Sequence, residues 1–464
     1  MPTQRTFLAL GFLTASLIAC GGDDAPPDPV DTPAQTLAKI ASGVDCAAPV
    51  GAGTSHSSTI SADETWSAAD SPHRVTGHIY LRASATLTIE PCAEVRLSPG
   101  VSIDSGGAGN ASQVIARGTI TGNVVHPVRF VADEAGTHWG TLTVFAPGSV
   151  DLAVAALIDG ASATSFQDDA GALEVRGEDT GVVQPVARVE NVLIRGAEGL
   201  GASVTLYGAF AADSHDLVID GSGNAANPYP IRMGTPAVGT LPTGSYAGNE
   251  RDEILIDTAR EIDVSDTFWN RGVPYRVAST VYVRSPDLAS EATLTIEAGV
   301  TLRMERNSFT TFFIGDNPAS YGALIAQGTA AQPITFTSAE DAPAPGDWHG
   351  LYFDGSQPGS NVLDHVIVEY AGGESSTTGF GCGPMDNDAS ILITGFHPDS
   401  AFLANSTIRH GGGGAAVVLG WTSDLDGPDF VAGNTFTDVP TCAVARWQNE
   451  TPPSSPGDDR NDCL

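Results

Sequence analysis

Hydrophobic and polar residues alternate over short stretches along most of this chain. Residues 86–90 read Thr-Leu-Thr-Ile-Glu, and residues 95–97, 128–130 and 142–144 alternate in the same way. A period of two places neighbouring side chains on opposite faces, so each stretch predicts a half-buried β-strand. Glycine, proline, asparagine and aspartate lie between the stretches and predict sharp turns. One stretch, residues 36–42, has a helical pattern instead.

The strand pattern occurs twice. Ala-Thr-Leu-Thr-Ile-Glu at residues 85–90 recurs at residues 292–297. Other matches keep the same order: Ile60-Ser61 with Val264-Ser265, Val95-Arg96-Leu97 with Leu302-Arg303-Met304, Ile115 to Thr119 with Ile325 to Thr329, Pro127 to Phe130 with Pro333 to Phe336, and Trp139 to Leu142 with Trp348 to Leu351. Ordered matches at a nearly constant spacing indicate an internal duplication.

Strands this short predict a coil of stacked rungs, in which each strand pairs with the same strand one turn later. Three strand-and-turn units make a turn of about 21 to 30 residues, which gives about 13 to 18 turns. We divide the coil into a first repeat region at 56–260 and a second at 261–446, followed by a C-terminal tail at 447–464. One continuous column and two separate modules both fit this pattern.

The repeated motifs also carry a family resemblance. The run from Thr65-Trp66 through residues 85–90 to Pro-Ile-Thr-Phe-Thr at 333–337 and Trp-His-Gly-Leu at 348–351 closely resembles bacterial parallel β-helix repeat lipoproteins. Residues 363–373 also resemble this family, and the resemblance covers roughly residues 60–445. It implies an all-β chain with a right-handed single-stranded parallel β-helix of the pectin-lyase-like fold. It implies little about function, because most such proteins have no assigned activity.

The N-terminus predicts export and lipidation. Arg5 precedes thirteen apolar residues, Phe7 to Ala19, a stretch too short to span a bilayer. Leu-Ile-Ala-Cys at 17–20, followed by Gly21, resembles the lipobox of bacterial lipoproteins. The resemblance implies a lipoprotein signal peptide at 1–19, acyl chains on Cys20 and export to the outer membrane, on its periplasmic or its surface side. An ordinary secretory signal is the alternative, and residues 20–55 are expected to form a flexible tether.

Composition narrows the possible partners. The 464 residues carry 55 acidic and 21 basic side chains, a formal net charge of −34, so phosphate would repel the chain and we expect no nucleic-acid partner. With 53 glycines and 30 prolines, a coiled coil or helical array is excluded.

The cysteines predict an oxidising compartment. With Cys20 lipidated, five remain as disulfide candidates: Cys46, Cys92, Cys382, Cys442 and Cys463. Sequence alone does not determine their pairing. We expect a bridge from Cys46 to Cys92 and another that holds the tail through Cys463, both structural rather than catalytic.

Several acidic residues and histidines are candidate catalytic groups. Glycosidic hydrolysis needs two carboxylates across the bond, and Asp168-Asp169 lies far in sequence from His410-Gly411, with no Arg-x-Lys in the chain. Asp364-His365 is similar to part of a pectate-lyase motif, but the arginine-containing partner motif is missing, so we interpret it as a strand and its turn. The catalytic residues stay unknown.

Metal and ring-binding motifs are weak as well. Residues 424–429 and Asp386-Asn387-Asp388 have acids spaced for Ca²⁺, yet both lack the length of an EF-hand and fit solvated loops better. We therefore expect neither a metal nor a cofactor, with Ca²⁺ as the alternative. Trp139 and Trp348, at matching places in the two copies, fit core packing better than sugar stacking, and the glycines at 411–414 fit a tight turn.

Together these patterns predict a cell-envelope lipoprotein, held in the membrane through Cys20, that presents a rigid β-helix. The expected role is non-catalytic: contact with a polysaccharide or another envelope protein, as a surface, adhesion or glycan-binding module. The alternative is a polysaccharide lyase or glycoside hydrolase. Carboxylates clustered on one groove would favour the enzyme, and scattered ones the passive module.

Overall fold

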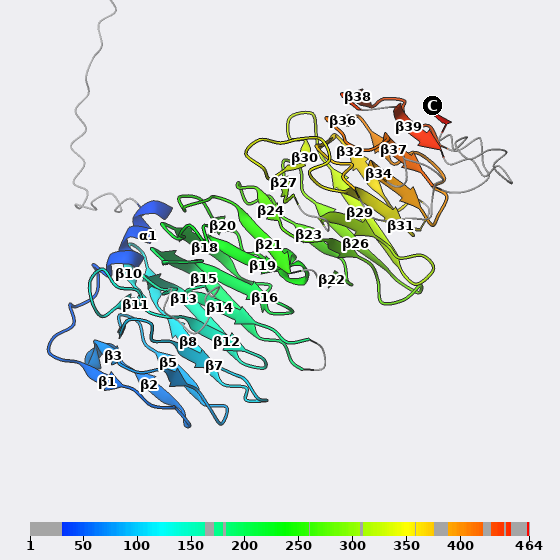
Figure 1. Cartoon of the computed structure of the whole chain (residues 1–464). Coiled ribbons are helices and arrows are strands. Elements are labelled where there is room, and N and C mark those ends of the chain that lie inside the picture. Colours follow the sequence, from blue (N-terminus) through cyan, green and yellow to red (C-terminus); the bar gives the residue numbers. More distant parts are fainter. Residues whose placement is uncertain are drawn as a thin grey trace, which may run out of the picture.

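The computed structural model describes residues 30–162, 171–179, 182–258, 260–306, 310–357, 359–374, 388–420, 428–439, 442–446 and 462–463. About 43% of the chain is strand and 5% helix. The strands stack into a single column, with the N-terminal strands at one end and the C-terminal strands at the other (Figure 1). Nearly all pairings are parallel, so the expected single-stranded parallel β-helix is confirmed.

One sheet runs almost the whole length of the column, and we call it the long sheet. Its 13 strands, in chain order, are β4 (Ile79–Tyr80), β7 (Ile103–Ser105), β12 (Leu142–Phe145), β14 (Leu173–Arg176), β16 (Ala202–Thr205), β19 (Ile231–Gly234), β21 (Ile254–Thr258), β24 (Tyr275–Val277), β27 (Thr301–Met304), β30 (Ile334–Ser338), β33 (Val366–Glu369), β36 (Thr407–Arg409) and β38 (Thr435–Thr437).

The other two faces of the N-terminal half belong to one 12-stranded sheet. Its strands are β1 (Thr54–His56), β2 (Glu64–Trp66), β3 (His73–Val75), β5 (Thr86–Ile89), β6 (Glu94–Leu97), β8 (Gln113–Arg117), β11 (Val128–Ala132), β13 (Ser149–Ile158), β15 (Val186–Arg195), β17 (Ala209–Phe210), β18 (His215–Asp220) and β20 (Gly244–Ser245). β13 and β15 bend from one face to the next at Val154 and Asn191, which adopt the left-handed backbone conformation with φ of 47° and 52°.

In the C-terminal half the other faces are separate sheets of eight and five strands. The eight-stranded sheet contains β22 (Glu261–Ile262), β25 (Val281–Val283), β28 (Thr311–Ile314), β31 (Gly350–Asp354), β34 (Ala389–Thr394), β37 (Ala415–Leu419), β39 (Cys442–Arg446) and β40 (Asp462–Cys463). The five-stranded sheet contains β23 (Asp266–Phe268), β26 (Glu291–Ile296), β29 (Tyr321–Gln327), β32 (Val362–Asp364) and β35 (Leu403–Ala404). Outside these sheets lie the hairpin β9 (Thr119–Thr121) and β10 (Val124–His126), the helix α1 (Pro33–Ser42), and the short helices η1 (Ala68–Asp70) and η2 (Thr235–Thr240).

The column has one continuous hydrophobic interior. A single cluster of buried side chains extends from Ile60 to Val444. Turn lengths vary more than expected: Thr54 pairs with His73, whereas Leu363 pairs with Leu403, so some turns are shorter and others longer than about 21 to 30 residues.

Residues at matching places in the two copies occupy matching places in this interior. Trp139 and Trp348 are fully buried, and each indole nitrogen donates to a backbone oxygen, that of Ile158 at 2.7 Å and that of Glu369 at 3.0 Å. Both tryptophans are therefore core residues, as the pattern favoured.

The two copies are not stacked in phase. In the first copy, the repeated motif lies on β5 and is followed by β6 and then β7; in the second it lies on β26, followed by β27 and β28. The long sheet contains β7 but also β27, the counterpart of β6. The second copy is therefore rotated by one face of the column relative to the first.

The segment expected to be a flexible tether is partly folded. From residue 30 onward it forms an N-terminal strap, residues 30–49, whose helix α1 begins with a capping box between Thr32 and Gln35. Ile40 on α1 is fully buried against outward-facing Val154, Ala156 and Leu193 of the 12-stranded sheet. The expectation of flexibility up to residue 55 is thus wrong for this part, because an apolar patch on the column holds the helix.

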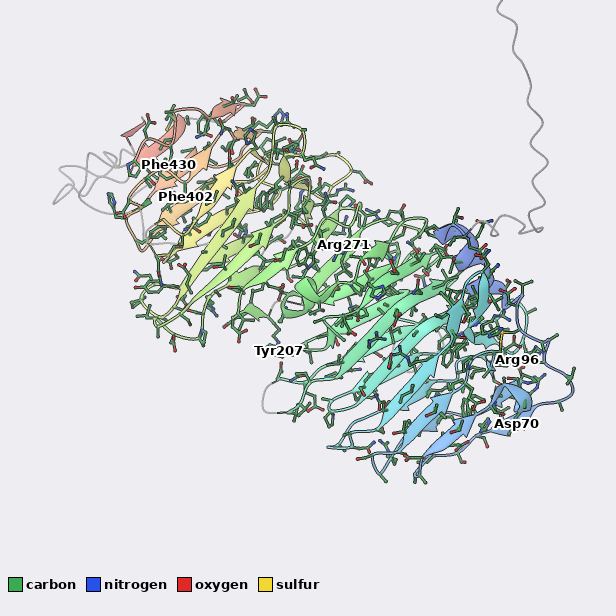
Figure 2. All side chains as sticks on the ribbon, turned by 180° about the vertical axis from the view of Figure 1, so that it is seen from behind. Asp70, Arg96, Tyr207, Arg271, Phe402 and Phe430 are labelled. Carbon is green, nitrogen blue, oxygen red and sulfur yellow. A yellow bond between two sulfur atoms is a disulfide. The ribbon has the colours of Figure 1, made fainter. Side chains whose placement is uncertain are left out.

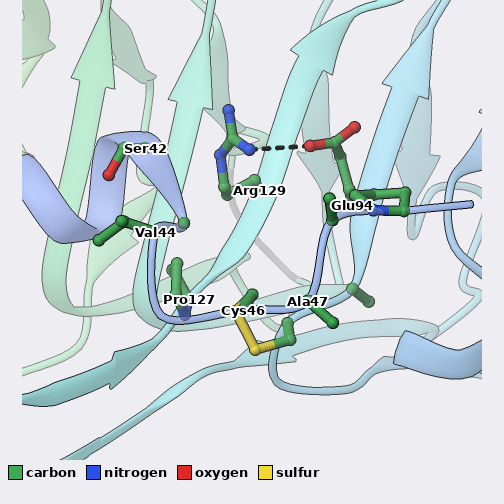
Figure 3. Close-up of a pocket in the computed structure, with 12 residues that line it drawn as sticks. Ser42, Val44, Cys46, Ala47, Glu94, Pro127 and Arg129 are labelled. Atoms are coloured by element: carbon green, nitrogen blue, oxygen red, sulfur yellow. Dashed lines mark hydrogen bonds and ion pairs between the residues drawn. A yellow bond between two sulfur atoms is a disulfide. The ribbon is translucent and has the colours of Figure 1, made fainter.

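A disulfide fastens the strap, as expected. Cys46 and Cys92 are bonded, and a pocket of about 310 Å³ lies beside the bridge (Figure 3). Across this pocket, Arg129 Nη1 lies 2.8 Å from Glu94 Oε2. The bridge ties the strap to the first turns of the column, and the ion pair joins β6 to β11 beside it.

Candidate functional site

The long sheet carries one uninterrupted row of outward-facing side chains, which we call the outer row. From Tyr80 to Thr337 each member lies between buried residues, and the last three members end their strands. Each member lies beside the next one in the sheet. From the N-terminal end the outer row comprises Tyr80, Asp104, Thr143, Glu174, Ser203, Arg232, Leu255, Arg276, Arg303, Thr337, Glu369, Arg409 and Thr437.

Two acids meet at one threonine in the first part of this row. Thr143 on β12 lies between Asp104 on β7 and Glu174 on β14. The Thr143 hydroxyl lies 3.5 Å from Glu174 Oε2 and also hydrogen bonds to Asp104. Thr141 extends the network, since its hydroxyl lies 2.5 Å from that of Thr143. We call Asp104, Thr143, Glu174 and Ser203 the acidic segment.

Burial makes both carboxyl groups unusually basic. Loss of solvation raises the pKa of Asp104 to about 6, partly opposed by Arg82 and by the Thr143 hydrogen bond. Loss of solvation also raises the pKa of Glu174 to about 6, opposed mainly by Arg176 and Arg232. Near neutral pH each group can therefore exchange a proton readily, and perturbed carboxyl groups of this kind mark candidate functional sites.

The acidic segment is sheltered although it lies on the outside of the sheet. Thr143 is 1% exposed and Glu174 3%, whereas Asp104 is only partly buried. Ser203, next to Glu174 in register, is fully buried, and its hydroxyl has no hydrogen-bond partner among the described residues. A buried hydroxyl without a partner costs about 1–3 kcal/mol relative to a bonded one, so Ser203 lowers the stability of this part of the sheet.

The second part of the outer row is basic, but its charges are already paired. Arg276 Nε lies 2.6 Å from Glu305 Oε1, and both Arg276 and Arg303 contact the buried Glu253. Arg409 Nε lies 2.6 Å from Glu369 Oε2. These arginines are held by the protein's own acids, so the acidic segment is the better candidate for ligand binding.

The duplicated counterpart of the acidic segment differs in chemistry. Arg82 lies 5.3 Å from the ring centre of Tyr80, and Arg284 lies 5.0 Å from that of Tyr282 on the matching strand of the second copy. The outward row that starts at Tyr282 continues with Phe313, Tyr352, Leu392 and Val418. An aromatic and aliphatic row thus replaces the carboxyl groups of the first copy.

The sequence-predicted catalytic residues do not form one site. Asp364 ends β32, and His365 occupies the following corner with φ of 52°, as interpreted. His410 occupies another corner, where its ring stacks on Tyr370 at 5.3 Å and its Nδ1 lies 3.2 Å from Asp438. Asp168 and Asp169 lie outside the described residues. No catalytic pair can therefore be built from these motifs within the described part of the chain.

Among the described residues, no group of three or more histidine, cysteine, aspartate or glutamate side chains is arranged to hold a metal. Asp386, Asp424 and Asp426 of the two suggested Ca²⁺ loops lie outside those residues. In the described part of the chain no helix combines the length and apolar character needed to cross a bilayer.

The structure describes only some of the remaining cysteines. Cys442 is disulfide-bonded, and β40, which carries Cys463, pairs antiparallel with β39. The bridge through Cys463 stays a prediction. Cys20 and Cys382 lie outside the residues that the structure describes.

Sequence reasoning missed the acidic segment. Asp104, Thr143 and Glu174 belong to three different turns and match no motif. The available signal was one acid in each of two short strands, such as the aspartate of Ser102-Ile103-Asp104. Only the register of the long sheet shows that they are neighbours.

Comparison with known proteins supports the fold. Residues 261–394 match a family model described as a pectate-lyase like beta helix domain. Searches of curated proteins and of solved structures found no match. The matched segment lies within the rotated second copy and does not include the acidic segment. The chain is therefore a parallel β-helix protein whose second repeat region is similar to the pectate-lyase-like β-helix domain.

Proposed function

We propose that this protein is a saccharide-binding module of a bacterial cell envelope, which holds an extended glycan along the outer row. The observation that carries the proposal is the acidic segment: the partly exposed carboxyl group of Asp104 and the sheltered one of Glu174, which meet at the Thr143 hydroxyl. Carboxyl and hydroxyl groups offer both donors and acceptors, which is what the hydroxyl groups of a sugar require.

The geometry of the row favours a long ligand over a compact one. Neighbouring strands lie about 4.8 Å apart, so the row repeats a side chain at that interval along a straight sheet. A linear polymer that lies along this part of the column would meet the exposed Tyr80 and the partly exposed Asp104 and Arg232, with the buried Thr143, Glu174 and Ser203 between them. The net charge of −34 favours neutral or amino-bearing sugars over polyanionic ones.

The placement in the envelope follows from the N-terminal sequence. Arg5, the apolar stretch from Phe7 to Ala19 and Cys20 support secretion and lipidation. Two or three acyl chains would anchor the protein stably. The disulfide between Cys46 and Cys92 agrees with an oxidising compartment outside the cytoplasm. Mass spectrometry of the mature protein tests the anchor, and an unmodified Cys20 would refute it.

A glycan array tests binding directly. The soluble form that starts at Gly21 is compared with the double variant Asp104→Asn, Glu174→Gln, and with the matched control Asp213→Asn, Glu64→Gln on other faces. We expect the double variant to lose binding to the internal segments of long linear glycans and the control to keep it. Equal binding by all three proteins, or no binding by the unaltered protein to any neutral or amino-bearing glycan, would overturn the proposal.

The carboxyl pair also favours a second candidate function, hydrolysis of the bound glycan. One carboxyl group would give its proton to the glycosidic oxygen as the bond to the anomeric carbon breaks, while the other takes a proton from the attacking water. The raised pKa values of Asp104 and Glu174 suit the acid role near pH 6. Hydrolysis would be established if the unaltered protein released shorter products from an array-positive glycan and Glu174→Gln did not. If the glycan stayed intact, binding would be the only function supported.

A further inference from the structure

We propose a second, independent saccharide site: a pocket at the C-terminal end of the column that takes a single sugar residue at the end of a glycan. The pocket has a volume of about 320 Å³ and lies on the five-stranded sheet, away from the outer row. It is lined by β32, by Ala404 at the end of β35, and by residues of the segments 359–361 and 396–402. Ligand pockets begin at about 300 Å³, so the size suits one ring and its substituents.

One wall of the pocket is apolar and held rigidly. The ring of Phe402 lies 4.9 Å from that of Phe353 and 5.3 Å from that of Phe430, which pack it in place. Figure 2 shows Phe402 and Phe430 side by side near the C-terminal end of the column. Phe396 and Pro398 extend this wall. A fixed apolar surface suits the C–H face of a sugar ring, because little side-chain freedom is lost on binding.

The polar side of the pocket combines an acceptor with a donor. Asp364 is held through Oδ1, which accepts from Asn405 Nδ2 at 2.9 Å and lies 2.9 Å from His365 Nδ1. Its other oxygen, Oδ2, has no such contact among the described residues. Asn361 accepts the Leu324 N–H through its Oδ1 at 2.8 Å, which orients its amide Nδ2 as a donor.

This combination selects a sugar over a cation. A carboxylate oxygen and an amide N–H can bind two neighbouring hydroxyl groups, since each hydroxyl both donates and accepts. An ammonium group only donates, so it would leave the Asn361 amide without a partner. Ser400, exposed at the rim, adds a further hydroxyl. The corner at Asp364-His365, interpreted above as structure alone, thus also supplies the main polar contact.

Titration of free monosaccharides into the soluble mature protein tests the proposal. The panel contains neutral hexoses, N-acetylhexosamines and a hexuronic acid, and tetramethylammonium serves as the cationic probe. We expect at least one sugar to bind with saturation at a ratio of one, and Asp364→Asn to weaken it about tenfold or more, as expected for a lost hydrogen bond to a charged group. The matched control Asp399→Asn removes an exposed neighbouring carboxylate outside the pocket and should bind normally.

Ser400→Trp provides a second test that does not depend on Asp364. The indole would fill the pocket from its exposed rim, so sugar binding should be lost while the circular dichroism spectrum stays unchanged. Normal sugar binding by Ser400→Trp, saturation by tetramethylammonium alone, or no saturation by any probe would each overturn the proposal.

Substitutions at one proposed site should leave binding at the other site unchanged. Asp104→Asn, Glu174→Gln should abolish array binding to polymers and leave monosaccharide titration unchanged. Asp364→Asn should weaken monosaccharide binding about tenfold or more and leave binding to the internal segments of polymers unchanged. If one double or single variant abolished both kinds of binding, the two regions would form one site and the independence proposed for the pocket would be wrong.

Discussion

Replacing Glu174 by glutamine should stabilise the protein at pH 8 and change its stability little at pH 4. Burial raises the pKa of Glu174 from an ordinary 4.5 to about 6, so the folded protein holds this proton more tightly than the unfolded chain. The stabilisation from the proton is fully present below about pH 4.5 and is lost as the pH rises through about 6. At pH 8 the folded state therefore carries an unfavourable buried charge, which glutamine removes.

The pKa values set the size of the effect. A difference between 4.5 and about 6 corresponds to about 2 kcal/mol in the free energy of unfolding. Glutamine has nearly the same shape, and its side-chain oxygen can still accept from the Thr143 hydroxyl at the place of Glu174 Oε2. The gain at pH 8 should therefore be about 2 kcal/mol, because the pKa of about 6 already includes the attraction to Arg176 and Arg232.

Urea unfolding at pH 8 and pH 4 measures this prediction. The quantity of interest is the stability change at pH 8 minus that at pH 4, which cancels effects of the substitution that do not depend on charge. Asp399→Asn, at an exposed site, is the control and should change little at either pH. Destabilisation by Glu174→Gln at pH 8, or an equal change at both pH values, would refute the reasoning. Loss of glycan binding in the stabilised variant would then show a site that sacrifices stability for function.

Three further changes test the packing. Replacing Cys46 and Cys92 by serine opens a link between residues 46 apart in sequence, so we expect a loss of about 4 kcal/mol by the chain-entropy estimate and faster hydrogen exchange in α1; unchanged exchange would contradict the role of the strap. Ile40→Ser should likewise release α1 to limited proteolysis while the column stays resistant, and equal resistance of both would count against docking. Trp348→Phe removes the donor to the Glu369 oxygen and should lower stability by about 1–3 kcal/mol in denaturant unfolding, which a neutral result would exclude.

The fold could be predicted because its signals are local. Alternation within five residues identified Leu87 and Ile89 as core residues, and the duplication transferred the same assignment to Leu294 and Ile296. The alternating pattern of such a strand indicates which face is buried even when the neighbouring strand is not known. The same reasoning identified Trp139 as core, because a residue at a fixed place in both copies points to packing.

The acidic segment and the strap could not be predicted because their signals are not local. Asp104 and Glu174 become neighbours of Thr143 only after turns of unequal length are stacked. The helix around Ile40 was visible as a pattern, and the unbroken apolar run at 152–158 indicates a strand covered on both faces, but neither shows that the helix is what covers it. In both cases the missing information is the register between turns.

The rotation between the copies determines what a ligand would meet along each face. If the second copy had stacked in phase, Asp104 and Glu174 would lie in line with Tyr282 and Phe313, and one face would carry all the strands that descend from the same part of the repeat. Instead, the long sheet joins β19 and β21 of the first copy to β24 and β27 of the second, so its outer row changes from acids to paired arginines. The turn between β21 and β24, with the short strands β22 and β23 that start two new sheets, makes this change. The residues at matching places, such as Phe313 in the place of Asp104, make the two copies different, and the rotation determines that arginines follow the acids along the long sheet. Binding to the acidic segment should therefore end where that turn begins.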